Sequence, residues 1–475
     1  MPPKRQIYLL DPKQLSPETI AVTFAKTSRS PLSFREIAAE LSDEESSEFH
    51  EKWVVGYGHA SVAEHAVLHV ALENISRRAV EVLESCRLAS FTEKSSRYQV
   101  YSSDLFFFPP ELTGHPLEED YQKFCGDLFA AYEHNRPKVE KGIVDLLPRM
   151  ENESESAWQR RIQGLARDIC RYYLPVSTLA NVGMTINARA LEHVICKLLS
   201  HPLQEVKEIG SEIKAIAQAK VPTLVKYASE NPCLMESYRD FSYNDEVEQP
   251  STQRINWLDV MEYDAYGEDQ VLAALLFRFG RKDFSHYREM VHHMGWAEKE
   301  KLTQALLGKI SEHDVPLREL EYASITLAVT LDQGCFGELK RHRMMTLTTQ
   351  PLTPDYGYAM PVLGGDAGLE TEFRELMERS RKLFVKIEES LNPDVAAYLL
   401  PHAYNRRILV KMNLRSAHHL LQLRTAARSH FAIRRITCRL AEELQPIYPL
   451  FAPFFTSRAG ETWQEIERKY FIQTQ

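Results

Sequence analysis

The sequence predicts an α/β protein that consists of two similar halves, each a mixture of strands and helices. Two pairs of segments recur in the same order. Residues 171–175 (Arg-Tyr-Tyr-Leu-Pro) precede Asn-Ala-Arg at 187–189, and residues 398–401 (Tyr-Leu-Leu-Pro) precede Asn-Leu-Arg at 413–415. Self-similarity of this kind indicates a duplicated structural unit. Strand-like alternation at residues 324–331 and helical spacing elsewhere indicate that each unit contains both element types.

The chain is long enough for two domains. It has 475 residues, of which 44% are hydrophobic and 26% charged, as in ordinary globular proteins. We expect a first repeat at residues 1–230, with a helical insertion at 111–150, and a second repeat at 254–475. Between them, residues 231–253 are polar, contain two prolines and carry an acidic cluster, which predicts a linker.

In the first half, residues 7–10 predict an opening strand, and residues 16–26 and 31–50 predict helices. Residues 58–65 predict a turn and helix start in which Ser61 and Glu64 form a capping box. Two histidines and a glutamate in this segment could also ligate a metal, but no further ligand follows at metal spacing. We therefore predict no metal site.

Each motif region combines a strand with a helix. Residues 66–72 and 324–331 predict strands, after which Asn74 and Asp332 stand where helix N-caps belong. Residues 154–173 predict an amphipathic helix that ends before a proline. Residues 180–186 predict a strand, Asn187 the start of a helix, and residues 205–219 a further helix.

Charge and cysteine content exclude several classes of protein. The formal net charge of −9 argues against bulk attraction to nucleic acid or anionic lipid. The seven cysteines are scattered without a Cys-x-x-Cys pair, as in proteins of a reducing compartment. The first residues lack the apolar run of a signal peptide, and no stretch approaches the length of a membrane span. We expect a cytoplasmic protein.

Positive charge is concentrated between His402 and Leu440. This stretch has nine lysines and arginines and no acidic residue. Because arginine binds phosphate bidentately and stays charged, the pattern favours a site for a multi-phosphate ligand or a nucleic-acid backbone. The alternative is a surface that pairs with acidic residues elsewhere in the fold.

Two shorter motifs could also bind phosphate. In Glu93-x-Ser95-Ser96-Arg97, with Arg87 upstream, adjacent hydroxyls and a guanidinium could hold one terminal phosphate. On local grounds alone, a capped turn is the better explanation of the same residues. The basic triplet at 341–343 is weak evidence by itself, because such triplets are common on surfaces.

In ordered combination these motifs resemble the flavin-dependent thymidylate synthases. In that family a Gly-His-x-Ser-x-x-Glu-His segment and an Ile-Ser-Arg helix lead into Arg-His-Arg and Ser-x-Arg-Tyr, followed by Leu-Pro and Asn-Ala-Arg. The resemblance covers nearly the whole chain, once in each half. It implies two tandem copies of the family fold, each a mainly antiparallel twisted sheet with packed helices.

Neither half is an intact copy of the family pattern. In the first half, Ser85 and Cys86 stand where the family has Arg-His, and Lys197 or Leu198 falls at its late arginine. The second half keeps the basic triplet, Leu-Pro and the late arginine but lacks Ser-x-Arg-Tyr. Pro351 and Pro354 disfavour the same backbone there.

The resemblance also implies ligands and roles. Family members bind FAD, dUMP and methylene-tetrahydrofolate, use NADPH as reductant, and form tetramers, so two chains of this protein would form a homodimer. Arg424 matches a catalytic arginine that polarises the pyrimidine. The residues implied for the nucleotide are Arg87, Glu93, Ser95, Ser96, Arg97 and Arg171. The residues implied for FAD are His59, Asn187, Arg341, His342, Arg343, Asn413 and Arg415.

Complementary losses in the two halves suggest that both copies contribute to one complete site. The function implied is reductive methylation of dUMP to dTMP. The first alternative is a diverged protein that binds flavin or nucleotide without this activity. The second, disfavoured by the net charge, is a nucleic-acid-binding or scaffold protein.

Overall fold

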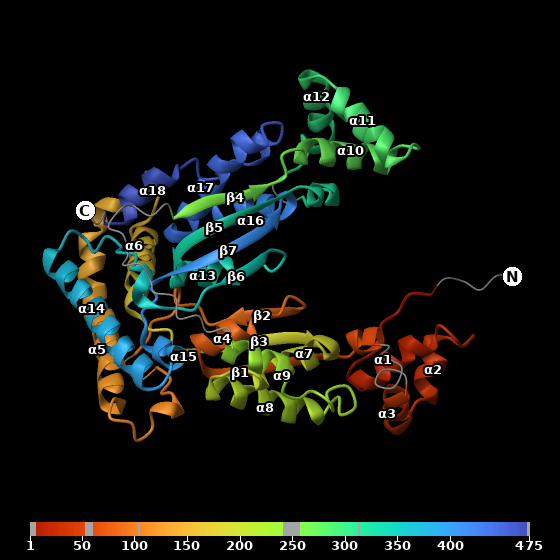
Figure 1. Ribbon diagram of the computed structural model, residues 1–475, viewed down its shortest axis with the longest axis horizontal. Helices are drawn as coiled ribbons and strands as arrows, with labels where there is room; N and C mark the ends of the chain where they lie inside the picture. The colour runs from red at the N-terminus through yellow and green to blue at the C-terminus, as the bar shows by residue number, and fades with distance from the viewer. Residues whose placement is uncertain (1–5, 53–59, 103–104, 241–256, 312–313, 473–475) are drawn as a thin grey trace. The chain divides into compact units, whose positions relative to one another are not determined.

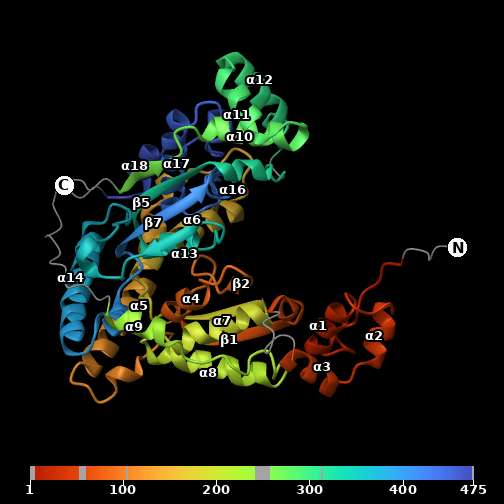
Figure 2. The same ribbon diagram turned by 45° about the vertical axis from the view of Figure 1, so that its right-hand side comes forward.

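The computed structural model describes residues 6–52, 60–102, 105–240, 257–311 and 314–472. The chain forms two compact units. The first comprises Met1–Ser95, Phe106–Glu118 and Ser177–Asp245, and the second comprises Ser96–Leu105, Glu119–Val176 and Glu246–Gln475. Each unit contains one antiparallel sheet and is rich in helices, as Figures 1 and 2 show. The prediction of a mixed α/β protein with one antiparallel sheet in each half is confirmed.

The sheet of the first unit has three strands in the order β1 (Val67–Ser76), β3 (Leu179–Asn187) and β2 (Ala89–Glu93). Buried residues alternate along β3, so one face of the sheet packs on the core. The helices of this unit are α1 (Pro17–Lys26), α2 (Phe34–Glu40), α3 (Asp43–His50), α4 (Arg77–Leu83), α7 (Ala188–Leu199), α8 (Gln204–Gln218) and α9 (Pro232–Asp240).

Two details of this unit differ from the sequence prediction. Residues 7–10 form no strand, and Ile7 and Leu9 are exposed, because a short apolar run alone does not secure a pairing partner. Asn74 is not a helix cap. It lies in a bulge of β1 with a φ of 58°, and Ser76 caps α4 by accepting a hydrogen bond from the Ala79 amide. Asparagine tolerates this left-handed conformation better than most residues.

The sheet of the second unit has four strands in the order β4 (Leu258–Tyr263), β5 (Ser324–Asp332), β7 (Asn405–Asn413) and β6 (Thr346–Thr349). The helices of this unit are α5 (Glu118–Gly142), α6 (Glu155–Cys170), α10 (Gly267–Phe279), α11 (Phe284–His293), α12 (Trp296–Leu307), α13 (Gln333–Leu339), α14 (Ala367–Ser390), α15 (Pro393–Ala396), α16 (Leu414–Arg424), α17 (Phe431–Ile447) and α18 (Trp463–Tyr470).

The pairing registers of the two sheets repeat one another. Val67 pairs with Asn187 in the first sheet, and Ser324 pairs with Asn413 in the second. On the other side of β3, Thr185 pairs with Ser90, and on the other side of β7, Lys411 pairs with Thr346. Strand β1 is one residue longer than β5, and its bulge absorbs the difference. The duplication inferred from the sequence is therefore also present in the backbone.

Part of the first repeat packs in the second unit. Helix α5 lies beside α14 (Figures 1 and 2), and Asp127 accepts a hydrogen bond of 2.6 Å from Arg379. The two Leu-Pro segments pair with each other, since the Val176 amide donates to the Leu400 carbonyl and the His402 amide donates to the Leu174 carbonyl. The compact units thus do not coincide with the sequence repeats, because residues 119–176 of the first repeat belong to the second unit. The predicted repeat boundaries stay a prediction. The predicted linker contains α9, and residues 241–256 lie outside the described part.

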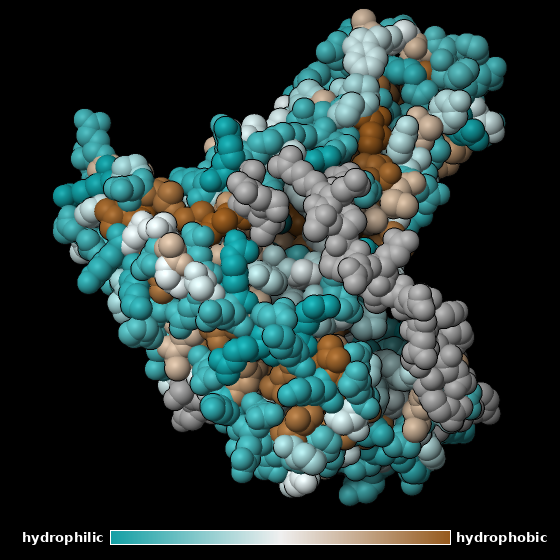
Figure 3. Space-filling view, turned by 60° about the vertical axis from the view of Figure 1, so that its left-hand side comes forward, coloured by the Kyte–Doolittle hydropathy of each residue, from teal (hydrophilic) through white to brown (hydrophobic). Residues whose placement is uncertain are grey.

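The face drawn in Figure 3 is mostly hydrophilic, with separate hydrophobic patches among the polar residues. Exposed large hydrophobic side chains include those of Phe277, Phe279 and Tyr322 in the second unit. In the part of the chain that the structure describes, no helix has the length and hydrophobicity needed to span a membrane.

Candidate functional site

Arg97 belongs to a cluster of charged side chains in the second unit. Its Nε and Nη2 donate to the two carboxylate oxygens of Asp168, at 2.8 and 2.9 Å, which is the bidentate geometry that arginine prefers. Its Nη2 also donates to the Arg428 carbonyl at 3.1 Å. Burial lowers the pKa of Arg97, but the bonds and charge of Asp168 outweigh this and raise it overall. Arg97 is therefore a fixed, permanently charged group.

Glu338, at the end of α13, connects Arg97 to two further arginines. Its Oε2 accepts a hydrogen bond from Arg424 Nη1 at 3.1 Å and lies 3.9 Å from Arg97 Nη1. Its Oε1 lies 3.5 Å from both terminal nitrogens of Arg171. The side chains of all four residues are at most 18% exposed. Arg97 and Arg171 come from the first repeat, and Arg424 and Glu338 come from the second.

His342 extends this cluster. Arg424 Nε donates to His342 Nε2 at 2.9 Å, so this nitrogen must be unprotonated. Burial, followed by the charges of Arg424 and neighbouring groups, lowers the pKa of His342 to about 3. The imidazole is therefore neutral near pH 7 and orients the Arg424 guanidinium.

Arg171 lies close to the start of helix α13, where a glycine leaves space for its side chain. The Asp332 side chain caps the helix by accepting from the Cys335 amide at 2.7 Å, as the sequence predicts. A Cβ at Gly334 would lie 3.3 Å from Arg171 Nη2 and 3.2 Å from Asp332 Oδ1. The absence of a side chain at Gly334 thus leaves room for the guanidinium beside the helix start.

The equivalent place in the first unit carries different residues. Lys197 stands near the end of α7, as Arg424 does at the end of α16, and its Nζ donates to Ser85 Oγ. Burial lowers the pKa of Lys197. A Lys–Ser contact therefore replaces the Arg–His contact, and the planar donor fork of Arg424 has no counterpart there.

The other residues implied for the nucleotide are only partly brought together. Ser96 is buried in the second unit beside Arg97 in sequence. Glu93 belongs to the first unit, where its Oε1 accepts from Arg77 Nη1 at 2.6 Å. Ser95 and the exposed Arg87 also belong to the first unit.

The residues implied for FAD have several surroundings. Asn187 and Asn413 cap α7 and α16, with bonds of 2.9 and 2.8 Å from the Ala190 and Ser416 amides. Arg415 Nη1 donates to Glu321 Oε1 at 2.7 Å. In the basic triplet, Arg341 is exposed, His342 buried and Arg343 intermediate. His59 lies outside the described residues.

Most of the basic stretch in the C-terminal part pairs with acidic residues elsewhere in the fold. Arg434 lies 3.1 Å from Glu461, and Arg435 lies 3.9 Å from Glu467 and stacks on Phe471. Arg406 is fully buried, with its guanidinium 4.6 Å above the Phe336 ring. The pattern interpreted as one extended anion site is thus largely a set of structural pairs.

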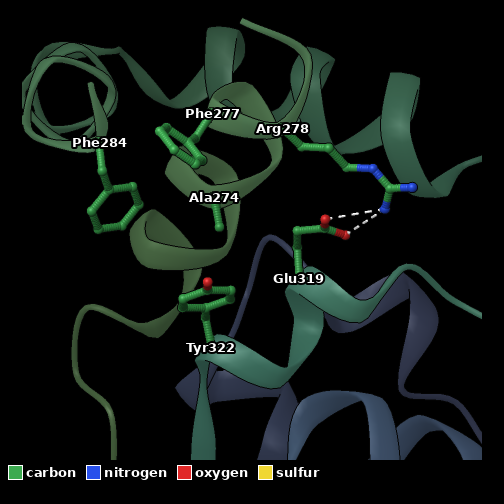
Figure 4. A pocket seen from close by; sticks show the side chains of 6 residues that line it. All are labelled: Ala274, Phe277, Arg278, Phe284, Glu319 and Tyr322. Carbon is green, nitrogen blue, oxygen red and sulfur yellow. Dashed lines mark hydrogen bonds and ion pairs between the residues drawn. The ribbon is translucent and has the colours of Figure 1, made fainter. Parts of the chain in front are cut away.

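An aromatic pocket lies between α10 and the 3₁₀ turn η6 (Arg318–Tyr322) in the same unit. It has a volume of about 460 Å³. Figure 4 shows the rings of Phe277, Phe284 and Tyr322 around it and the double hydrogen bond of Arg278 to Glu319, both at 3.1 Å, at its edge. Such a lining suits a planar ring more than a phosphate, because the cation at its edge is already paired.

Sequence reasoning missed Glu338, Asp168 and the aromatic pocket. Asp168 lies three residues before Arg171 on the helix that precedes it, so its place near the arginines could have been expected from that spacing. Glu338 carries no such signal, because it meets Arg97 and Arg171 across more than 160 residues of sequence.

Comparison with known proteins gives a match for each half of the chain. The sequence pattern of the thymidylate synthase complementing protein family matches residues 10–223 and 260–450. The two matched segments fall one in each predicted repeat.

Individual relatives are of two kinds. A UPF0159 protein of Chlamydia muridarum is 28% identical over 460 residues, covering 90% of this chain and 85% of the relative. A UPF0159 protein of Thermoplasma acidophilum is 25% identical over 450 residues, covering 87% and 89%. The flavin-dependent thymidylate synthase of Clostridium tetani is 28% identical over 218 residues, covering 45% of this chain and 82% of that enzyme. The chain is therefore similar to the two UPF0159 proteins over most of its length and to the enzyme over less than half of its length.

Proposed function

Because the chain belongs to the thymidylate synthase complementing protein family, we propose that it is an FAD-dependent enzyme that methylates dUMP to dTMP. The methyl donor is methylene-tetrahydrofolate and the reductant is NADPH. Each half would be one copy of the family fold, and two chains would form a homodimer. The partial similarity to a flavin-dependent thymidylate synthase supports this choice of reaction.

One observation carries the proposal. Arg97 and Arg171 from the first repeat and Arg424 from the second converge on Glu338 in one compact unit. These are the residues that the family resemblance assigns to the nucleotide and to polarisation of its base. A cluster supplied by both copies is expected if each copy has lost a different part of the site.

For FAD, the second unit offers groups that fit its chemistry. The aromatic pocket beside η6 is wide enough for a planar ring, and Arg415 is fixed to Glu321 on the same turn. Arg341 is exposed next to the cluster in sequence and carries a charge suited to a phosphate. When bound, FAD would supply the redox step, and the protein side chains would supply position and charge.

The proposal is tested with the purified full chain. We expect a flavin absorption spectrum, or saturable binding of added FAD, and formation of dTMP from dUMP with methylene-tetrahydrofolate and NADPH. Arg97→Gln should reduce kcat/KM by at least tenfold, because it removes the bidentate pair and a cation. Arg379→Gln, on the exposed side of α14, should leave the rate unchanged. Absence of both FAD binding and dUMP binding in titration calorimetry would contradict the proposal.

Binding without turnover is the second candidate. The observation that favours it is the Lys197–Ser85 contact, which replaces the Arg–His contact in the first unit. It predicts dUMP and FAD binding with no dTMP formed and no rescue of a thymidine-requiring strain. The same assay therefore separates the two candidates.

A further inference from the structure

Glu338 is the only group among the described residues that contacts all three arginines of the cluster. We propose that its carboxylate stands where an anionic group of a ligand would bind, and that it competes with that group. The inference deepens the proposed function and rests on it in taking the anion to be a phosphate. It makes Glu338 a residue that sets affinity for phosphate.

Two of the three arginine contacts of Glu338 are long for bonds between charged groups, and the third, from Arg424 Nη1, is 3.1 Å. Tight arginine–carboxylate bonds are about 2.7–2.9 Å, and Arg97 makes two such bonds to Asp168, at 2.8 and 2.9 Å. By contrast, Glu338 is 3.5 Å from both terminal nitrogens of Arg171 and 3.9 Å from Arg97. The three guanidinium groups are therefore spaced more widely than one carboxylate requires, as suits a larger anion with three oxygens.

The charges of the cluster identify Glu338 as the exchangeable partner. The other carboxylates near these arginines are Asp168, which bonds Arg97, and Asp332, which caps α13 beside Arg171. Asp168 is saturated by one arginine with good geometry, and only Glu338 is shared by all three among the described residues. The Glu338 side chain is 6% exposed, so its negative charge is poorly screened by water. A phosphate placed among the same arginines would meet this charge at close range, which disfavours binding.

The nearby structure permits the carboxylate to leave without loss of the arginines. Asp168 and the Arg428 carbonyl continue to hold Arg97, and His342 continues to hold Arg424 through its Nε. Within the described part of the chain, only Arg171 would exchange its hydrogen-bonded partner completely. Replacing Glu338 by a neutral group of the same shape should thus keep a binding-ready cluster.

The experiment compares the full chain with Glu338→Gln. Titration calorimetry is performed with inorganic phosphate, with dUMP and with deoxyuridine. We expect phosphate and dUMP to bind at least tenfold more tightly to the variant, with a steeper loss of affinity at high salt, and deoxyuridine to bind equally to both. Glu378→Gln serves as the matched control, because Glu378 lies on the exposed face of α14 and its loss changes net charge equally.

The possible results are distinct. Equal or weaker binding of phosphate by Glu338→Gln, or no phosphate binding by either protein, would overturn the inference. Tighter phosphate binding without any dUMP binding would support it and contradict the proposed nucleotide function. If Glu338→Gln does not fold in a thermal melt, Glu338→Asp replaces it. That variant keeps the charge but withdraws it by one methylene, so we expect a smaller gain in phosphate affinity, and no gain would overturn the inference.

Discussion

Arg97 has a guanidinium whose two edges face different anions. One edge is bonded by both oxygens of Asp168, and the remaining nitrogen points toward Glu338 at 3.9 Å. Fixing one edge reduces the conformational entropy that a ligand would otherwise have to overcome. Arg424 is fixed in the same manner by His342, whose lone pair accepts from its Nε. Asp168 and His342 thus hold Arg97 and Arg424 in place. Glu338 contacts a different nitrogen of each of these guanidinium groups.

His342 gives a prediction at the scale of one residue. Its pKa is lowered to about 3 from an ordinary value of 6.5, mainly by burial. Below pH 6.5 the unfolded chain takes up a proton at this residue and the folded chain does not, so stability falls as pH falls toward 3. The loss due to His342 approaches about 1.4 kcal/mol per pH unit.

The measurement is urea unfolding of the wild type and His342→Gln between pH 7 and pH 4. Glutamine keeps an acceptor for Arg424 but does not titrate here. We expect the free energy of unfolding of the wild type to decrease relative to that of the variant as pH falls. Two parallel curves would show that His342 is not held neutral in the fold.

Helix α13 gives a prediction at the scale of an element. It contains two glycines that differ in their surroundings. A Cβ added at Gly334 would lie 3.3 Å from Arg171, whereas one added at Gly337 would meet nothing within 4 Å. Alanine is favoured over glycine inside helices by about 0.5–1 kcal/mol. Gly337→Ala should therefore stabilise the protein slightly and leave dUMP binding unchanged.

Gly334→Ala should retain part of that helical gain but displace Arg171 by a few tenths of an ångström. We expect weaker binding of phosphate or dUMP, by about threefold to tenfold, in titration calorimetry. The two alanines differ only in what their methyl groups meet. Equal affinities for both variants would mean that Arg171 does not take part in binding.

The two sheets share one equivalent hydrogen bond, which is made by different residues in each unit. In the first unit, Arg77 on α4 donates to the Lys94 carbonyl at 2.9 Å. At the equivalent place of the second unit, Arg406 on β7 donates to the Gln350 carbonyl at 2.9 Å. The carbonyl directly after β2 in the first sheet and directly after β6 in the second accepts a hydrogen bond from an arginine. This arginine lies on α4 in the first unit and on β7 in the second. Losing the partner of a partly buried carbonyl costs free energy, which explains why the bond persists while the sequence changes.

This leads to a second prediction about an element, strand β7. Arg406 is fully buried and also bonds Gln333, whereas its neighbour Arg407 is exposed and stacks on Tyr356. Arg406→Ala should lower the free energy of unfolding by about 2–4 kcal/mol, because it leaves a cavity and unpaired polar groups. Arg407→Ala should cost about 0.5 kcal/mol or less. Equal costs in denaturant unfolding would contradict the buried role of Arg406.

At the scale of the whole molecule, the sequence predicts what is local or repeated. The helix that starts near Ser154, the helix start at Asn187 and the cap at Asp332 depend on a few neighbouring residues and are confirmed. The prediction of a strand at residues 7–10 is wrong, because pairing depends on distant residues that a short apolar run does not reveal. For the same reason the acidic partners of the C-terminal arginines and the role of Glu338 could not be inferred from the sequence.

The exchange of segments between repeats gives the last prediction. Residues 119–176 belong to the first repeat in sequence but pack within the second unit, where Asn135 bonds Glu372 at 2.8 Å and Tyr173 packs against Phe373. A fragment of residues 257–475 lacks α5, α6, Arg97 and Arg171, so its core is incomplete and Glu338 loses two of its three arginines. We expect it to melt without cooperativity when expressed alone.

Co-expression with residues 1–240 should restore the missing core, because α5 and α6 are then supplied by the second fragment. The two fragments should co-purify, recover a cooperative thermal transition, and bind dUMP as the intact chain does. The matched control is the intact chain carrying Arg379→Gln, which removes one exposed bond between α5 and α14 and should melt cooperatively. If residues 257–475 alone unfold cooperatively at the temperature of the full chain, the first repeat contributes no core to the second unit. The arginine cluster would then form where two halves that are each stable by themselves come into contact.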